Sequence, residues 1–186
     1  MTSLAVQPFL GIFRAQPVSS SVAFSVRHSG VFWYRGRLSD VTATLRGEAD
    51  ALVLEGSARV DSISVVEPAA MRAHVLGPEF FDAERHPAIR FRSTAIRLAD
   101  HGAAEVEGEL TIRGVTRAVT ASGHYAAPRP VNFGEAAGLE LHTSFDRREF
   151  GFDWQMELPG GVDAVSWEVE LDIDLLLTRD AAEARA

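Results

Sequence analysis

Side chains able to carry chemistry are few in this sequence and widely spaced. The six histidines are scattered, and His124 and His142 come together only if the strands that contain them pair. Two histidines without a third ligand make a weak metal site, so no metal is expected. The alternate carboxylates Glu168 and Glu170 fall on the polar side of a predicted strand, where they act as a solubilising stripe.

His28 and Arg147 are the polar residues placed best to meet a ligand. His28 ends a run of alternating apolar residues, so its ring can hydrogen-bond a head group, although a structural histidine fits equally well. Arg147, like Arg72 and Arg148, carries a fork of donors that suits phosphate. A solvated or salt-bridged arginine is the ordinary alternative. The sequence has no glycine-rich phosphate loop, no dinucleotide fingerprint and no recognisable Ser-His-Asp arrangement.

Length and composition set the class of protein. A chain of 186 residues with 46% apolar residues predicts one domain over 1–186, with its core at about 18–178. The net charge of −8 and the lack of a basic cluster argue against nucleic acid and against anionic lipid head groups. There is no cysteine, and therefore no disulfide or thiolate chemistry.

The N-terminal residues and the lengths of the apolar stretches bear on localisation. Residues 1–17 lack a basic start, and their apolar stretch is broken by Gln7 and Pro8, unlike an export signal. No segment approaches the roughly 18 apolar residues of a membrane span. We therefore expect a cytoplasmic protein without stable membrane insertion.

The elements that must position these residues are predominantly strands. Leu110 and Ile112 alternate with polar neighbours before Arg113-Gly114, and Val115 and Val119 do so after it, which predicts a hairpin. Pro68 and the Gly77-Pro78 stop predict one short helix over 67–76. The other predicted strands are 20–28, 34–46, 52–62, 88–98, 139–146 and 165–177, with the second hairpin strand ending near 125 and a loop over 126–137.

The strand predicted over 165–177 has one apolar and one charged face, as an antiparallel sheet with one buried side requires. The fold class is therefore all-β: eight antiparallel strands and a short helix. Eight such strands fit a closed up-and-down barrel able to enclose one small ligand. A two-sheet sandwich is the competing architecture, and alternation alone does not separate the two.

Several segments, in order, resemble the YceI-like family of lipocalin-like barrels. They are Val22–His28, Glu79–Asp82, His86–Ser93, the hairpin Gly108–Arg117 and Arg147–Gly151. The chain departs from the family pattern in the helix, where Met71 and Arg72 replace the usual Arg-Asp, and at Glu149, where Asp is usual. Any role that the family gives the helical Asp is therefore not carried over.

This resemblance implies a barrel that holds a long apolar chain, either a polyisoprenoid or a prenyl quinone, as cargo for carriage or storage. It implies no cofactor, no established catalytic residue and a tendency of such barrels to pair as homodimers. The chain's 11 Phe and 3 Trp against 2 Tyr suit an apolar tunnel.

The aromatic residues supply most candidate ligand contacts. Strand aromatics at inward positions also serve simply as core, whereas adjacent loop aromatics such as Phe80 and Phe81 cannot all point into one core. The predicted ligand-binding residues are Phe24, His28, Phe32, Trp33, Phe80, Phe81, Phe91, Leu110, Ile112, Phe145, Arg147, Phe150, Trp154 and Trp167.

Two rival functions stay open at this point. An enzyme acting on an isoprenoid or quinone-like substrate would use His28 as acid or base and Arg147 to stabilise an anion, and it needs polar groups that converge in the cavity. A stress-related interaction domain would have a solid core and an exposed apolar patch beside the helix. A lipid carrier needs only apolar walls.

Overall fold

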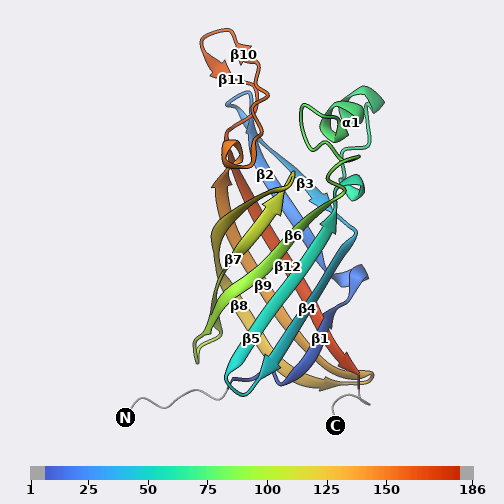
Figure 1. Ribbon diagram of the computed structural model, residues 1–186, viewed down its shortest axis with the longest axis vertical. Helices are drawn as coiled ribbons and strands as arrows, with labels where there is room; N and C mark the ends of the chain where they lie inside the picture. Colours follow the sequence, from blue (N-terminus) through green and yellow to red (C-terminus); the bar gives the residue numbers. More distant parts are fainter. Residues whose placement is uncertain (1–6, 181–186) are drawn as a thin grey trace.

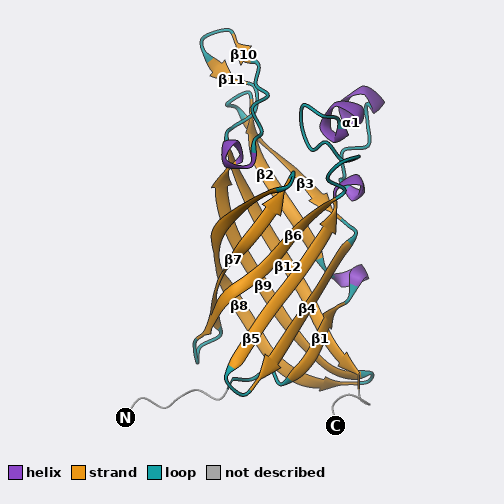
Figure 2. Cartoon of the chain, in the orientation of Figure 1, coloured by secondary structure: helices purple, strands orange, loops and turns teal. Residues whose placement is uncertain are grey.

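The computed structural model describes residues 7–180, most of which lie in β-strands (Figures 1 and 2). One sheet contains β1 (Gly11–Ala15), β2 (Ser21–His28), β3 (Phe32–Leu38), β4 (Val41–Glu48), β5 (Ala51–Arg59), β6 (Ala88–Leu98), β7 (Ala103–Ile112), β8 (Val115–Val131), β9 (Gly134–Asp146) and β12 (Glu168–Asp180). The remaining elements are the helix α1 (Ala69–Leu76), the ribbon of β10 (Glu157–Leu158) and β11 (Val162–Asp163), and 3-10 turns at Pro17–Ser19, Val60–Ser62 and Arg147–Phe150.

The sheet closes into a barrel because β12 has partners on both sides. β9 pairs along one side of β12, while β2 and then β1 pair along the other. β3 pairs with β2, and β4 pairs with β1. β1 and β2 together therefore fill one strand position, and β3 and β4 together fill the next. The result is a closed antiparallel barrel of eight strand positions, which confirms the predicted barrel over the sandwich.

The predicted hairpin is confirmed, with a primed turn. Arg113 and Gly114 have φ values of 52° and 73°, so both central residues are left-handed, which matches the twist of the flanking strands. Ile112 lies directly opposite Val115. The Arg113 side chain then donates to the carbonyl oxygens of Gly151 and Pro78 and thereby ties this turn to two neighbouring loops.

Two strand boundaries at the start of the chain differ from the prediction. β1 was not predicted, since its five residues include only one buried side chain, Phe13. The strand predicted over 34–46 is interrupted at Ser39 and Asp40. Their backbone groups bond to the end of β5 and to the turn that follows it, with Arg59 N 2.9 Å from Asp40 O and Ser39 N 3.1 Å from Ser62 Oγ.

The loop predicted over 126–137 is wrong: β8 runs to Val131 and β9 starts at Gly134. The prolines at 128 and 130 are tolerated for two reasons. Pairing of β8 with β7 ends at His124, so the rest of β8 has a sheet partner on one side only. The ladder to β9 is also irregular between Ala126 and Arg129. Edge positions and bulges are where strands accept proline.

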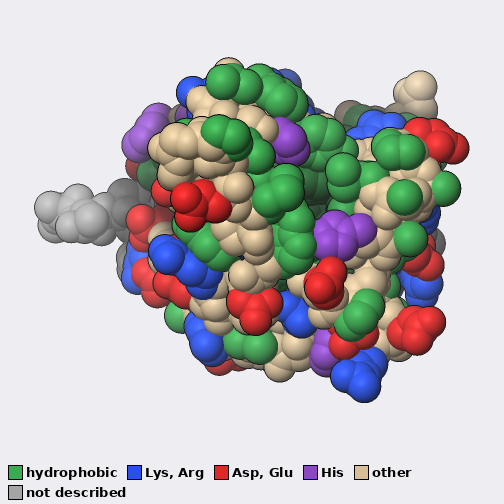
Figure 3. All heavy atoms as spheres, turned by 90° about the horizontal axis from the view of Figure 1, so that it is seen from above, with side chains coloured by type: hydrophobic (Ala, Val, Ile, Leu, Met, Phe, Trp, Pro, Cys, Tyr) green, Lys and Arg blue, Asp and Glu red, His purple; other side chains and the backbone are tan. Residues whose placement is uncertain are grey.

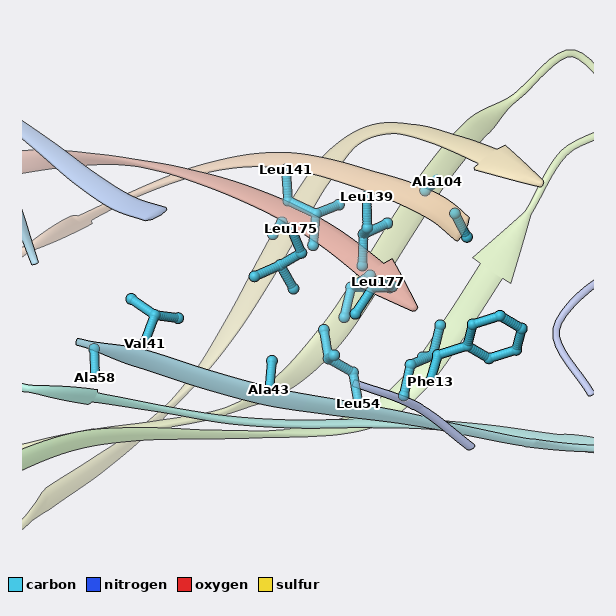
Figure 4. Packing of buried hydrophobic residues seen from close by; sticks show 14 of the residues in the cluster. Phe13, Val41, Ala43, Leu54, Ala58, Ala104, Leu139, Leu141, Leu175 and Leu177 are labelled. Carbon is cyan, nitrogen blue, oxygen red and sulfur yellow. The ribbon is translucent and has the colours of Figure 1, made fainter. Parts of the chain in front are cut away.

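The two ends of the barrel are built differently (Figure 1). The tight turns β4–β5, β6–β7 and β8–β9 lie at one end, termed the closed end. The longer connections, with α1 and the β10–β11 ribbon, lie at the other end, termed the mouth. Inside the closed half, Phe13, Ala104, Leu139 and Leu177 pack against one another from several strands (Figure 4). Phe13 and Leu177 are fully buried there, so this half of the barrel is solid.

Candidate ligand-binding cavity

A cavity of about 620 Å³ occupies the mouth half of the barrel. Its walls come from β2 to β9, β12, α1 and the loops at the mouth, and its floor includes Leu38, Ala43, Leu54 and Leu175. Most of the lining residues are aliphatic or aromatic. This volume falls in the usual range for sites that enclose a small ligand.

The exposure of inward-facing side chains distinguishes the hollow half from the solid half. Phe9, Phe13 and Leu45 in the closed half are at most 1% exposed. Phe24 and Phe91 point inward from β2 and β6 and line the cavity, yet they are only half-buried. Inward-facing aromatic residues keep this exposure only when no side chain fills the space in front of them. The solid-core alternative therefore does not describe the mouth half.

Two glycines keep the cavity walls thin where the phenylalanines lie. Gly36 is directly opposite Phe24 on β3, and a Cβ placed on it would lie 2.3 Å from the Phe24 ring. Gly108 on β7 lies opposite Ser93, diagonal to Phe91, and a Cβ placed on it would lie 2.4 Å from the Phe91 ring. Both rings therefore lie against bare backbone rather than projecting across the lumen.

Arg147 is a buried cation at the mouth, 3% exposed, and it lines the cavity. Within the described residues its guanidinium donates to the main-chain carbonyls of Ser166 at 3.0 Å, Trp154 at 3.0 Å and Val165 at 3.4 Å. Burial lowers the pKa of this guanidinium from its ordinary value, and the carboxylates of Asp146 and Asp163 partly offset the effect. Arg147 thus fixes the loop after β9 and brings a positive charge to the entrance.

An aromatic cluster around His74 of α1 forms one side of the mouth. The imidazole lies 4.9 Å from the Trp154 ring and 5.5 Å from the Phe80 ring, edge-on to both. Its Nδ1 is 3.5 Å from Glu79, while its Nε2 is covered and has no hydrogen-bond partner among residues 7–180. Sequence reasoning did not select His74 or the neighbouring Phe152; the loop aromatics Phe80 and Trp154 were the available signal.

His28 lies across the mouth at the end of β2. Its Nδ1 is 3.0 Å from Ser29 Oγ, its ring packs at 5.2 Å against Phe32, and its backbone bridges to Val165. Three of the polar lining residues, His28, His74 and Arg147, therefore lie at the mouth, whereas the floor residues Leu38, Ala43, Leu54 and Leu175 are apolar. A molecule with a polar head and an apolar tail fits this arrangement with its tail directed to the floor.

The structure brings most of the predicted ligand-binding residues to the cavity. Those on its lining are Phe24, His28, Phe32, Phe80, Phe81, Phe91, Leu110, Ile112, Phe145, Arg147 and Trp154. Their contact with a ligand stays a prediction. Three others lie off the lining, namely Trp33, Phe150 and Trp167.

Each of the three has a physical reason for its position. Trp33 follows cavity-lining Phe32 in β3, so the two-residue period turns it outward, where Arg27 lies 5.0 Å over its ring. Phe150 is fully buried behind the wall against Phe145. Trp167 precedes β12 rather than lying within it, and its ring stacks with Arg147 at 4.3 Å.

The other polar candidates are engaged elsewhere. Arg72 donates to the backbone carbonyls of Asp61, Ile63 and Val65 and so anchors α1. Arg148 pairs with Asp146, which lowers the pKa of that carboxyl by hydrogen bonding. His124 faces Glu140 rather than His142, whose Nδ1 is 2.8 Å from Asp172.

Two further features of residues 7–180 bear on the kind of site. No group of three or more His, Asp or Glu side chains there is arranged to hold a metal ion. No helix in the same range has the length and apolar character needed to cross a membrane.

Comparison with known proteins places the barrel in a family. The sequence model of the YceI-like domain matches residues 13–177. This chain belongs to the YceI-like family. A UPF0312 protein of Pseudomonas putida is 30% identical over 103 residues, 55% of this chain and 50% of that protein. A UPF0312 protein of Shewanella denitrificans is 29% identical over 136 residues, 71% of each chain. The chain spans about half the length of the P. putida relatives it matches.

Solved structures share the YceI-like barrel. BcnA of Burkholderia cenocepacia superposes with a TM-score of 0.72 at 20% identity, covering 89% of this chain and 99% of BcnA. A polyisoprenoid-binding domain from Saccharophagus degradans, implicated in plant cell wall breakdown, has a TM-score of 0.62 at 11% identity and covers 91% of this chain and 99% of that domain. At these identities the likeness establishes the fold.

Proposed function

We propose that this YceI-like chain binds one long-chain isoprenoid, or the prenyl tail of a quinone, inside the barrel for carriage or storage. The observation that carries the proposal is the apolar cavity of about 620 Å³ that opens at the mouth and ends on a solid floor. The polyisoprenoid-binding domain of S. degradans, with the same fold, supports it.

The energetics favour an apolar cargo. Burying some 300 Å² of a prenyl chain contributes roughly 7 kcal/mol at about 25 cal/mol per Å², before the entropic cost of association. The polar end of the cargo lies at the mouth beside His28 and Arg147. Arg147 has the charge for a phosphate head group, and a quinone carbonyl can accept from the same donors.

Extraction of the natively expressed protein with organic solvent, followed by mass spectrometry, tests the proposal. We expect one polyisoprenoid or prenyl quinone for each chain. A second measurement titrates the emptied protein with a fluorescent prenyl analogue. An empty extract together with no uptake of the analogue would refute the proposal.

A catalytic role for His28 and Arg147 is the second candidate. Both residues line the mouth and meet at Val165, which bridges to the His28 backbone and accepts from Arg147. Against it, the guanidinium hydrogen bonds found here go to main-chain carbonyls, as in a structural arginine. Incubation of the protein with a prenyl quinone and chromatography of the extract decides this: recovery of an altered quinone would favour the enzyme. The homodimer, the cytoplasmic location and a stress-related role stay predictions.

A further inference from the structure

Exposed apolar side chains gather around the mouth. In residues 7–180 the large apolar residues with substantial exposure include six at this end, which we term the apolar rim: Val31, Phe32, Val66, Met71, Met156 and Val162. They come from three projections, namely the β2–β3 turn, α1 with the segment before it, and the β10–β11 ribbon with its approach. Seen from above, apolar side chains surround a hollow at this end (Figure 3). Clustered exposed apolar groups of this kind mark an interaction surface.

The apolar rim is continuous with the cavity. Phe32, Met71 and Met156 belong to both, since each is exposed at the rim and also lines the cavity wall. An apolar path therefore runs through these residues from the outer surface to the floor. A protein interface has no need of such a path, whereas a surface that passes an apolar molecule inward does.

Two of the three projections are in direct contact with each other. Ser29 N donates to Ala164 O at 2.8 Å, which joins the β2–β3 turn to the ribbon. A Cβ on Gly30 would lie 3.2 Å from Val162, so the two rim segments are in close contact. On the other side of the mouth, Arg72 anchors α1 to the carbonyl oxygens of Ile63 and Val65, in the segment that precedes the helix. The rim is therefore held in place around the opening.

Charges beside the rim indicate which kind of surface it meets. Glu67, Glu157 and Asp163 follow the rim residues Val66, Met156 and Val162 in the sequence, and the whole chain carries a net charge of −8. An anionic surface would be repelled rather than attracted. Contact must therefore come from apolar burial, as at the interface of a neutral, zwitterionic bilayer.

We propose that the apolar rim docks on the surface of a phospholipid bilayer, with the mouth facing the membrane, so that an apolar cargo enters the barrel directly from the lipid. The part of this inference that concerns cargo rests on the proposed function. Direct entry spares the cargo a passage through water, where each exposed CH₂ is unfavourable.

A fluorescent reporter tests the docking without any cargo. The chain has no cysteine, so Val31→Cys carries a single polarity-sensitive label at a rim site that is 76% exposed and not part of the cavity wall. Val18→Cys is the matched control, since Val18 is 99% exposed in the turn between β1 and β2. With phosphatidylcholine vesicles the label at position 31 should shift to shorter wavelength, at low and high salt alike, while the label at position 18 stays unchanged. Equal behaviour of the two labels would overturn the docking.

Charged variants test the path of the cargo. Val31→Asp with Val162→Asp should weaken partition to phosphatidylcholine vesicles about tenfold or more. It should also slow the transfer of a fluorescent prenyl analogue from vesicles to protein, with the amount bound at equilibrium unchanged. Phe133→Asp, at the exposed β8–β9 turn of the closed end, is the control and should alter neither.

The outcomes separate the two proposals. A label shift without uptake of the analogue would uphold the docking and refute the prenyl cargo. Uptake that is unaffected by the rim variants, with no label shift, would uphold the cargo and refute the docking. A dimer in solution that Val31→Asp with Val162→Asp converts to a monomer would identify the rim as a protein interface and overturn the proposal.

Discussion

The contact between Gly36 and Phe24 offers a sharp test of the cavity. In Gly36→Ala the new Cβ would lie 2.3 Å from Phe24 Cζ and 2.6 Å from Cε1. Ordinary carbon contacts begin near 3.5 Å, so the ring must move by about 1 Å or more. The β3 backbone blocks movement outward. The ring therefore swings into the lumen, where it takes the place of part of the cargo.

The expected effect follows from the contact that the cargo loses. Exclusion of about 60 Å² of prenyl surface removes about 1.5 kcal/mol, which weakens binding of a prenyl analogue roughly tenfold. The free energy of unfolding should change by less than about 3 kcal/mol, the usual cost of overpacking. Fluorescence titration and urea denaturation measure the two quantities on the same preparation.

Gly56→Ala is the matched control on β5. Gly56 lines the cavity, but a Cβ there meets nothing nearer than 3.6 Å. It should bind the analogue about as tightly as the unchanged protein. Shortening the displaced side chain, in Gly36→Ala with Phe24→Leu, should restore binding toward the original value. Unchanged affinity in Gly36→Ala, or a loss that Phe24→Leu fails to recover, would refute the steric argument.

Three other changes probe the closed half, the mouth and the outer face of the sheet. Phe13→Ala should lower the free energy of unfolding by about 3–5 kcal/mol in urea denaturation, because the fully buried ring leaves a void. Arg147→Leu should lower it by about 2–4 kcal/mol, since buried carbonyls lose their donor; an unchanged denaturation midpoint would contradict this. Burial and the neighbouring carboxylates of Glu140 and Asp172 raise the pKa of Asp174. Its ionised form therefore lowers the free energy of unfolding at neutral pH, and protonation in acid removes this cost. Asp174→Asn should therefore stabilise by about 0.2–1 kcal/mol at pH 7 and low salt, with the gain fading as pH falls through the folded pKa.

The sequence by itself determined the fold class and part of the register. Alternation in the segments that became β2, β6, β7 and β12 has a period of two, which only a strand satisfies, and Arg113-Gly114 required a tight turn between β7 and β8. The same alternation placed Phe24 and Phe91 on the inner face, and the pattern of the segment that became β9 did so for Phe145. The segments that resemble the YceI-like family, which occur in the family's order, then indicated a lipocalin-like barrel.

Strand boundaries that depend on backbone hydrogen-bond partners were not predicted from the sequence. Prolines in the last part of β8 indicated a loop, yet β8 is paired there with β9 alone, and proline removes no essential donor. Trp167 continues the apolar alternation of β12, but the backbone of this residue accepts from Arg147 N and the strand begins only at Glu168. The partner of Trp167, Arg147, is distant from it in sequence.

Only the tertiary structure decided whether the barrel is hollow. Inward-facing residues look alike in both halves, because a local pattern records which side of a strand is apolar and not how far the opposite wall lies. Phe13 meets side chains from the far wall, whereas the end of the Phe24 ring lies against Gly36 and the ring borders the cavity. The gathering of His28, His74 and Arg147 at one end likewise depends on strand order and closure, which join segments more than a hundred residues apart.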